Sequence, residues 1–276
     1  MGRQIFRRLL KNRLATISLV LMALIILIAI FAPLIAPYDY AAQDYDNMLS
    51  PPNSEHLLGT DNFGRDLLSR IIYGSRYTLI VGFTCATIAA VVGTVFGVLA
   101  GLNKTVDMLL MRVVDVMMGI PSFTLNLCLV LTLGKNISSL IWALSITQIP
   151  VFARVVRVQI MSVSNNEYIE AAASLGANKV RIVMTHMLPN ILAPIIVQYT
   201  FQIVNTVMAG ASLSFIGMGI QPPEPEWGVL ISAGRTYLRS NWHLAIMPGV
   251  ALILITYALN LLGDGLRDAL DPRLKQ

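Results

Sequence analysis

The sequence predicts an all-α, polytopic membrane protein with six transmembrane helices, and three observations support this fold class. Hydrophobic residues make up 55% of the 276 residues and charged residues only 13%, whereas a soluble domain usually carries about 25% charged residues. The mean hydropathy is +0.68. The apolar residues gather in long stretches, and about 20 such residues cross roughly 30 Å of hydrocarbon as a helix.

The first apolar stretch, residues 15–36, contains no charged residue and is predicted to be the first transmembrane helix. A cleavable signal peptide is the alternative. It is disfavoured because the stretch exceeds the roughly 7–15 apolar residues of a signal peptide and no Ala-x-Ala cleavage site follows it. Residues 1–14 are then expected to be a cytoplasmic N-terminal segment.

Residues 37–76 hold six acidic residues and the turn-forming sequence Pro51-Pro52-Asn53. We predict a folded extracytoplasmic loop, with a short amphipathic helix on the membrane surface from Leu67 to Tyr73. The run from Asp61 to Asp66 lacks the alternating acids and the final Glu of a calcium loop. It is therefore interpreted as a turn with a locally bonded Asp.

Five further apolar stretches form a domain, residues 77–266, which is followed by a cytoplasmic tail, residues 267–276. This domain includes the cytoplasmic loop 159–190. The five predicted helices cover residues 77–101, 111–133, 137–158, 192–217 and 244–264.

Small residues and prolines suggest how these helices pack. Gly93, Gly97 and Gly101 recur every four residues, a spacing that lets helix backbones approach closely. We predict a packing face inside this subunit rather than a dimer contact. Pro121 and Pro150 lie inside predicted helices and are expected to kink them.

The basic residues set the expected orientation. Fourteen of the 20 Lys and Arg residues fall on the side of the N-terminus and six on the other side. Because cytoplasmic loops carry an excess of Lys and Arg, both termini and the loop 159–190 are predicted to face the cytoplasm. Segments 37–76 and 218–243 are predicted to face outward. The fourteen residues are Arg3, Arg7, Arg8, Lys11, Arg13, Lys104, Arg112, Arg154, Arg157, Lys179, Arg181, Arg267, Arg273 and Lys275.

Residues 167–189, which we call the polar segment, lie between two strongly apolar stretches. The sequence predicts two short helices, with Gly176 at the turn because glycine accepts the left-handed conformation that ends many helices. Pro189 stops the second helix. Glu167 and Glu170 offer negative charge to a cytoplasmic partner. An ordinary helical hairpin packed on the membrane surface is the alternative.

The polar segment resembles the EAA motif of ABC importer permeases. The matching residues are Glu170-Ala171-Ala172, Leu175-Gly176-Ala177, Ile182, His186 and Leu188-Pro189. In that family the motif forms a coupling helix that docks on the cytoplasmic ATPase. The resemblance implies that the ATPase is contacted by Glu167, Glu170, Ala171, Ala172, Leu175, Gly176 and Ala177.

Further segments resemble the peptide- and nickel-transporting permeases, and in particular the C-type subunit of dipeptide and oligopeptide importers. They are residues 56–70, 221–228, 260–268 and 271–274. The resemblance implies a type I importer transmembrane domain that carries peptides, with nickel or glutathione as alternative solutes. It also implies a B-type permease partner, two cytoplasmic ABC ATPase subunits and an extracytoplasmic solute-binding protein, at the cytoplasmic membrane of a bacterium or archaeon.

Gln198, Gln202 and Asn205 lie at positions i, i+4 and i+7 of the predicted fifth helix. Polar side chains at membrane depth usually face protein or a water-filled cavity. They are candidates for lining the solute pathway, and hydrogen bonding between helices is the alternative. Asp115 is predicted to pair with Arg112, three residues earlier on the same helix and near its cytoplasmic edge, and a proton relay is the alternative.

Several functional classes lack the residues that they need. The sequence contains no Gly-x4-Gly-Lys-Ser/Thr loop, no His-Glu-x-x-His and no Gly-x-Ser-x-Gly, so no ATP hydrolysis, cofactor, metal or catalytic residue is predicted. The basic residues flank helices and form no stripe for nucleic acid. A secondary transporter or channel is the other class considered, and it would be expected to carry ionisable residues deep in its helices.

Overall fold

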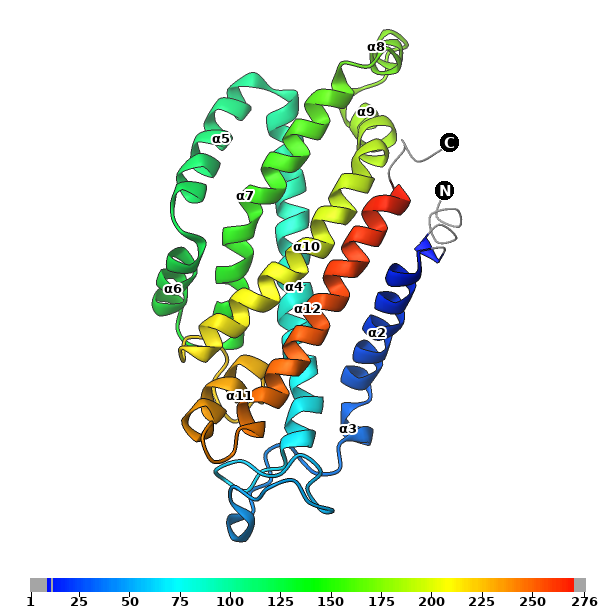
Figure 1. Cartoon of the computed structure of the whole chain (residues 1–276). Helices are drawn as coiled ribbons and strands as arrows, with labels where there is room; N and C mark the ends of the chain where they lie inside the picture. The colour runs from blue at the N-terminus through cyan, green and yellow to red at the C-terminus, as the bar shows by residue number, and fades with distance from the viewer. Residues whose placement is uncertain (1–8, 11, 271–276) are drawn as a thin grey trace.

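The computed structural model of the chain describes residues 9–10 and 12–270, in which long helices run side by side as a bundle (Figure 1). Some residues used for the expected orientation and family resemblance lie outside the described part. They are Arg3, Arg7, Arg8, Lys11, Arg273, Lys275 and the segment 271–274.

The bundle confirms an all-α membrane fold. The long helices are α2 (Arg13–Ile30), α4 (Leu67–Leu102), α7 (Ile137–Ser164), α10 (Leu188–Phe215) and α12 (His243–Leu270). Among the described residues, these five helices are long and apolar enough to cross a membrane, and the span that contains α10 is counted from Lys179 to Phe215. A sixth span is counted if the bent pair α5 (Lys104–Gly119) and α6 (Ser122–Leu133) is one crossing. The shorter elements are α3 (Ala32–Ile35), η1 (Tyr45–Asn47), α8 (Glu167–Ser174), α9 (Lys179–Ile182), η2 (Val183–Met187), α11 (Trp227–Gly234) and η3 (Arg235–Tyr237).

The predicted third helix is broken rather than kinked. The axes of α5 and α6 meet at 94°. Ile120, between them, has extended backbone angles, the conformation that a following proline imposes on its neighbour. Pro121 then caps α6. Pro150 has a smaller effect, because α7 continues through it as one helix.

The predicted surface helix at Leu67–Tyr73 is wrong, because these residues are the first turns of α4. The Asp66 carboxylate accepts a hydrogen bond from the Ser69 backbone N–H at 2.8 Å and so caps the helix there. A helix of 36 residues is about 54 Å long at 1.5 Å per residue. It therefore extends well beyond the hydrocarbon and supports the loop before it.

The predicted glycine packing face lies inside the chain, as expected. α4 packs on α7 more extensively than any other two elements of the described chain pack on each other. A Cβ atom on Gly97 would lie 2.6 Å from the Val156 Cβ, and a Cβ on Gly101 would meet Ile160. The absence of side chains thus sets the distance between the two helices.

Replacing Gly97 by alanine is expected to lower the midpoint of thermal unfolding, because overpacking of this kind costs about 1–3 kcal/mol. Gly249 of α12 is the matched control, since no atom lies within 4 Å of the position of its Cβ. Gly249→Ala should leave the midpoint unchanged or raise it, because alanine is the better helix former. Equal midpoints for the two variants in detergent would contradict the packing role.

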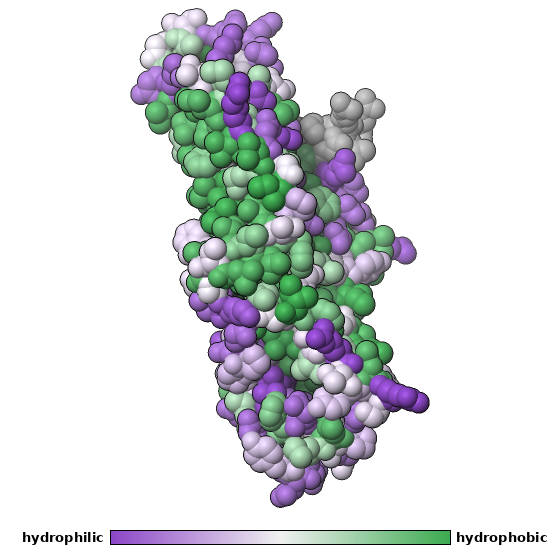
Figure 2. Space-filling view, turned by 90° about the vertical axis from the view of Figure 1, so that its left-hand side faces the viewer, coloured by the Kyte–Doolittle hydropathy of each residue, from purple (hydrophilic) through white to green (hydrophobic). Residues whose placement is uncertain are grey.

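The bundle has two polar ends. At one end lie α8, α9 and the described ends of α2 and α12, and at the other end lie the loop 37–66 and α11 (Figure 1). On the face shown in Figure 2, hydrophobic residues gather between hydrophilic ends. Trp142 and Trp242 are about half exposed and belong to the α11 end of the bundle. Tryptophan favours the membrane–water interface, which indicates that one membrane surface lies at this level.

Candidate functional site

The polar segment folds as a helix, a turn and a second helix at the end of the bundle where α7 ends and α10 begins (Figure 1). α8 is followed by a four-residue turn and by α9, and η2 joins α9 to α10 without a break. The predicted turn between two helices is confirmed. The prediction that Pro189 stops the second helix is wrong, because Pro189 lies in the first turn of α10, where proline needs no backbone N–H partner. A displacement of this segment would therefore pass directly into a membrane-spanning helix.

The turn depends on Gly176, whose φ of +81° lies in the left-handed region. The Ala177 N–H donates to the Ala172 carbonyl at 3.1 Å, and the Gly176 N–H donates to the Ala173 carbonyl at 3.0 Å. This pair of bonds is a Schellman motif, which satisfies carbonyls that a helix end leaves free. Ala172 and Ala177, on either side of the turn, both pack against one apolar cluster, which is described next.

One side of the polar segment is anchored on the bundle. Ile169 of α8, Ile182 of α9 and Met187 are buried in a cluster with residues of α7 and α10. The other members of this buried cluster are Val156, Ile160, Val183 and Ile191. Because the cluster joins both short helices to two long ones, the segment is held as one body with them.

The opposite side of the polar segment exposes apolar and acidic residues together. Leu175 at the turn is 89% exposed and Val180 is 72% exposed. Tyr168 and Met184 are exposed as well. The predicted contact residues Glu167, Glu170, Ala171 and Gly176 are exposed, and Ala172 and Ala177 are half-buried. Apolar residues gathered at a polar end are typical of a surface that binds another protein.

The three candidate pathway residues differ in their surroundings. Gln202 is buried, donates to the Gln148 side chain of α7 and accepts from Gln198 at 3.3 Å. Gln198 is half-buried and lines a cavity of about 420 Å³ together with Arg267. Asn205 is exposed. The structure therefore links Gln198 and Gln202 but not Asn205.

The predicted pairing of Asp115 with Arg112 is wrong. Asp115 of α5 forms its ion pair with Arg154 of α7, at 2.5 Å. Asp107 of α5 forms a second ion pair with Arg157 of α7, with Nη2 and Oδ2 at 2.6 Å. Sequence spacing identifies partners on one helix only, and here α5 packs along α7, which brings the guanidinium groups of the neighbouring helix within reach.

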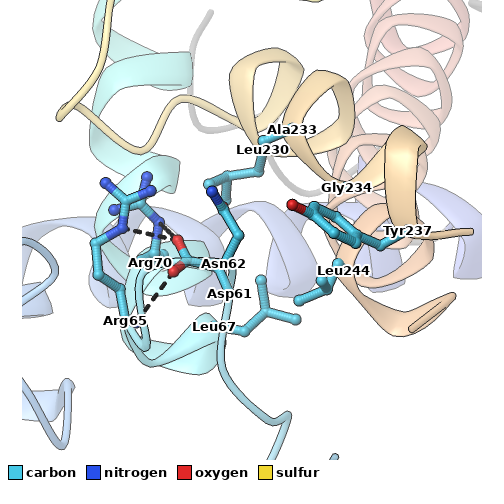
Figure 3. A pocket seen from close by; sticks show the side chains of 10 residues that line it. All are labelled: Asp61, Asn62, Arg65, Leu67, Arg70, Leu230, Ala233, Gly234, Tyr237 and Leu244. Atoms are coloured by element: carbon cyan, nitrogen blue, oxygen red, sulfur yellow. Dashed lines mark hydrogen bonds and ion pairs between the residues drawn. The ribbon is translucent and has the colours of Figure 1, made fainter. Parts of the chain in front are cut away.

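At the opposite end of the bundle, Asp61 holds two buried arginines (Figure 3). Its carboxylate accepts hydrogen bonds from the Phe63 and Arg65 backbone N–H groups, at 2.8 and 3.0 Å, and from Arg65 Nε at 2.7 Å. Arg70 Nε lies 3.6 Å from the same carboxylate, and Arg70 Nη1 donates to the Tyr40 carbonyl at 2.8 Å. The predicted turn with a locally bonded Asp is confirmed.

This Asp61 cluster attaches the loop 37–66 to the rest of the α11 end. The small cavity beside it, about 20 Å³, is lined by Asp61, Arg70 and residues of α11 and α12 (Figure 3). That volume is about the size of one water molecule. The Asn241 side chain donates to the Leu49 carbonyl at 3.0 Å and adds a second attachment.

Glu226 is a buried carboxyl group that sequence reasoning missed. It precedes α11 and caps it, accepting a hydrogen bond from the Val229 N–H at 3.2 Å. Burial raises the pKa of Glu226 above its usual 4.5, although hydrogen bonds from the Gly228 and Val229 backbone oppose the shift. A carboxyl with a raised pKa binds more protons when folded than unfolded, so it destabilises the fold at high pH, and this penalty is lost as pH falls toward 4.5.

Glu226→Gln is therefore expected to raise the midpoint of thermal unfolding at pH 8, because glutamine keeps an oxygen acceptor for the helix and has no charge to bury. The gain should shrink as pH is lowered to 5. Melting curves across this range test the prediction, with Glu224→Gln, two residues away and only half-buried, as the control. A gain that grows toward acid pH would contradict it.

Comparison with known proteins adds the family context. The model of the family described as "Binding-protein-dependent transport system inner membrane component" matches residues 93–276. The model of the "N-terminal TM domain of oligopeptide transport permease C" matches residues 1–52.

Curated relatives match almost the whole chain. The dipeptide transport system permease protein DppC of Alkalihalophilus pseudofirmus is 42% identical over 99% of this chain and 90% of its own length. The di/tripeptide permease protein DppC of Pseudomonas aeruginosa is 40% identical over 96% and 89%. The glutathione permease protein GsiD of Pectobacterium atrosepticum is 39% identical over 99% and 91%.

A solved structure shares the fold. The inward-facing MetNI methionine ABC transporter matches with a TM-score of 0.62 and 21% identity, over 74% of this chain and 98% of the matched chain. The predicted importer-type transmembrane fold is confirmed by this match.

Proposed function

The chain belongs to the family of binding-protein-dependent transport system inner membrane components, and from this we propose that it forms half of an ATP-driven pathway for short peptides. Members of this family are permease subunits, and ATP hydrolysis resides in a separate partner. The observation that carries the proposal is the polar segment, which presents exposed Leu175 beside Glu170 and continues into α10.

Peptides are the proposed solutes because relatives at 40–42% identity bear dipeptide and di/tripeptide names. Glutathione, the solute named for a relative at 39% identity, is itself a peptide. Nickel is the less favoured alternative, because these relatives at 39–42% identity bear peptide or glutathione names.

The proposed orientation places the α8 end in the cytoplasm of a bacterium. Fourteen of the 20 Lys and Arg residues fall on that side of the sequence and six on the other, and such an excess is typical of cytoplasmic loops. Of the fourteen, Arg13, Lys104, Lys179 and Arg267 are described at that end of the bundle. The loop 37–66 and α11 then face outward, where a solute-binding protein would deliver the peptide.

The proposed mechanism is alternating access. Two cytoplasmic ATPase subunits close on ATP, and one of them holds the polar segment through Glu167, Glu170, Leu175 and neighbouring residues. Because the cluster around Ile169 joins this segment to α7 and α10, its motion tilts both helices. The pathway between this chain and a B-type permease then opens outward, and hydrolysis returns it. Gln198 and Asn205 are proposed to line that pathway. Gln202, buried against Gln148 of α7, instead forms the hydrogen bond between helices that was the alternative for these residues.

Co-purification from native membranes tests the assembly. A tagged chain should retain a second permease and subunits whose mass spectra contain the Gly-x4-Gly-Lys-Ser/Thr loop of an ATPase. Leu175→Asp should release the ATPase and leave the second permease bound, because an unpaired carboxylate cannot be buried in a contact without large cost. A complex that holds no ATPase, or one that Leu175→Asp leaves intact, would argue against the proposal.

A further inference from the structure

Arg154 and Asp115 form an ion pair on the surface of this chain, with side chains 46% and 62% exposed. The neighbouring pair, Arg157 and Asp107, is more enclosed, at 27% and 21%. Neither pair is used by the mechanism described above. The exposed pair is unusual because of its depth.

The packing of α7 on α4 gives this depth. A Cβ on Gly93 would collide with Phe152 and lie 3.1 Å from the Ala153 backbone N, so Arg154 lies about level with Gly93. The chain carries no charged residue between Arg76 of α4 and Lys104, the first residue of α5. At 1.5 Å per residue, Gly93 lies about 26 Å from Arg76 and about 16 Å from Lys104. The pair is therefore near the middle of the membrane, deeper than the cytoplasmic side to which Arg154 was assigned from the sequence.

The broken helix adds a second observation on the same helices. Residues 118–124, which include the 94° bend between α5 and α6, are all exposed. The break lies between two contacts with α7, the ion pair to Arg154 and the hydrogen bond from Thr147 to Asn126 at 2.8 Å. It is thus at membrane depth as well.

Lipid cannot cover these features. Charged side chains inside a membrane face protein or water, and irregular backbone at membrane depth occurs only where it is buried in protein or lines a water-filled cavity. Packing the pair against a dry interface would cost the desolvation of both charges, which their attraction repays only where further hydrogen bonds satisfy them. A water-filled cavity satisfies both features.

We propose that the surface formed by the α5–α6 break and the Arg154–Asp115 pair faces the solute pathway, and that this pair contacts the charged termini of a peptide in transit. A guanidinium group forms paired hydrogen bonds with a carboxylate, so Arg154 takes the peptide C-terminus. Asp115 takes the ammonium group. The Arg154–Asp115 pair thus offers one positive and one negative group to a peptide that carries one charged group of each sign. The peptide contact rests on the proposed function, whereas exposure to water does not.

Thiol labelling tests the exposure to water. In a Cys128→Ser background, with Cys85 buried, Ser122→Cys lies at the break and Val20→Cys on the exposed, uncharged surface of α2. In the reconstituted complex, a charged methanethiosulfonate should modify Ser122→Cys more than about tenfold faster than it modifies Val20→Cys, because the reactive thiolate forms only in water. Equal rates, or an unreactive Ser122→Cys that cross-links to the second permease, would overturn the inference.

Capped peptides test the contact with solute. The wild-type complex should take up alanyl-alanine about tenfold faster than its C-terminal amide, and Arg154→Gln should remove most of this preference, because charge-assisted hydrogen bonds are worth about that factor. Asp115→Asn should likewise remove most of the preference for free alanyl-alanine over N-acetylated alanyl-alanine, which lacks the ammonium group. Asp107→Asn, at the other α5–α7 ion pair, is the control for a merely structural effect.

The outcomes separate the two proposals. If the wild-type complex transports no peptide, the proposed function fails and the labelling result still decides which surface faces water. If peptides are transported and Arg154→Gln keeps the full preference for the free C-terminus, the contact with solute is wrong.

Discussion

Glu170→Lys is expected to abolish ATP-driven uptake while the chain still inserts and assembles with the second permease. Glu170 is exposed on α8, beside the fully exposed turn at Leu175, and its backbone is fixed by packing rather than by its carboxylate. Placing a like charge in a complementary contact costs several kcal/mol, and each 1.4 kcal/mol is about tenfold in occupancy. Uptake into vesicles should therefore fall by more than about tenfold.

The control for this charge reversal is Asp268→Lys, which reverses an exposed acid at the same end of the bundle but outside the polar segment. It should retain most of the uptake. Glu170→Gln should lie between wild type and Glu170→Lys. If Glu170→Lys and Asp268→Lys transport equally well, the acidic side of α8 is not a coupling contact.

Asp61→Ala is expected to produce the largest loss of stability among single substitutions at the α11 end. The substitution leaves Arg65 and Arg70, 6% and 2% exposed, without the carboxylate that lies between them. Removing one partner of a buried ion pair costs about 3–5 kcal/mol, because a charge remains buried without compensation. Thermal unfolding in detergent and protease cleavage within the loop 37–66 would both report the loss.

Two further variants separate this cause from a general effect of mutating the loop. Asp39→Ala removes an exposed carboxylate of the same loop that accepts a hydrogen bond from the Ala41 N–H, and it should be nearly neutral. Adding Arg70→Met to Asp61→Ala should recover part of the stability, because it removes one stranded charge. The account is wrong if Asp61→Ala unfolds at the same temperature as Asp39→Ala.

Local patterns in the sequence were sufficient for much of the fold. The uncharged stretches located the long helices, since each must satisfy its backbone within itself. Gly176 located the turn of the polar segment, because a left-handed position favours glycine, and the glycine spacing in α4 located its closest packing.

Features that depend on a neighbouring element were not predictable in this way. Leu67–Tyr73 is amphipathic by itself, yet Asp66 and the loop packed around it extend α4 through these residues. The partner of Asp115 comes from α7, 39 residues later. Exposure of Leu175 could not be read from sequence either, because leucine is among the residues most often found buried.

The candidate site likewise contains residues that local sequence patterns indicate and residues whose surroundings depend on neighbouring helices. The motif pointed to Glu170 and Gly176 from their order in the chain; the turn at Gly176 is confirmed, and the ATPase contact of Glu170 stays a prediction. The pathway residues were chosen from helical spacing alone, and the structure separates buried Gln202 from exposed Asn205. Spacing gives the face of a helix but not which neighbour covers it.

The most direct test of the account is the energy source for uptake. The complex is reconstituted into vesicles with its solute-binding protein, and entry of labelled dipeptide is measured with ATP supplied on the side of the α8 end. We expect uptake that requires hydrolysable ATP, persists when ionophores collapse every ion gradient, and is lost in Glu170→Lys. Uptake that continues without nucleotide, or that stops when the gradients are collapsed, would contradict a permease driven through its polar segment by an ATPase.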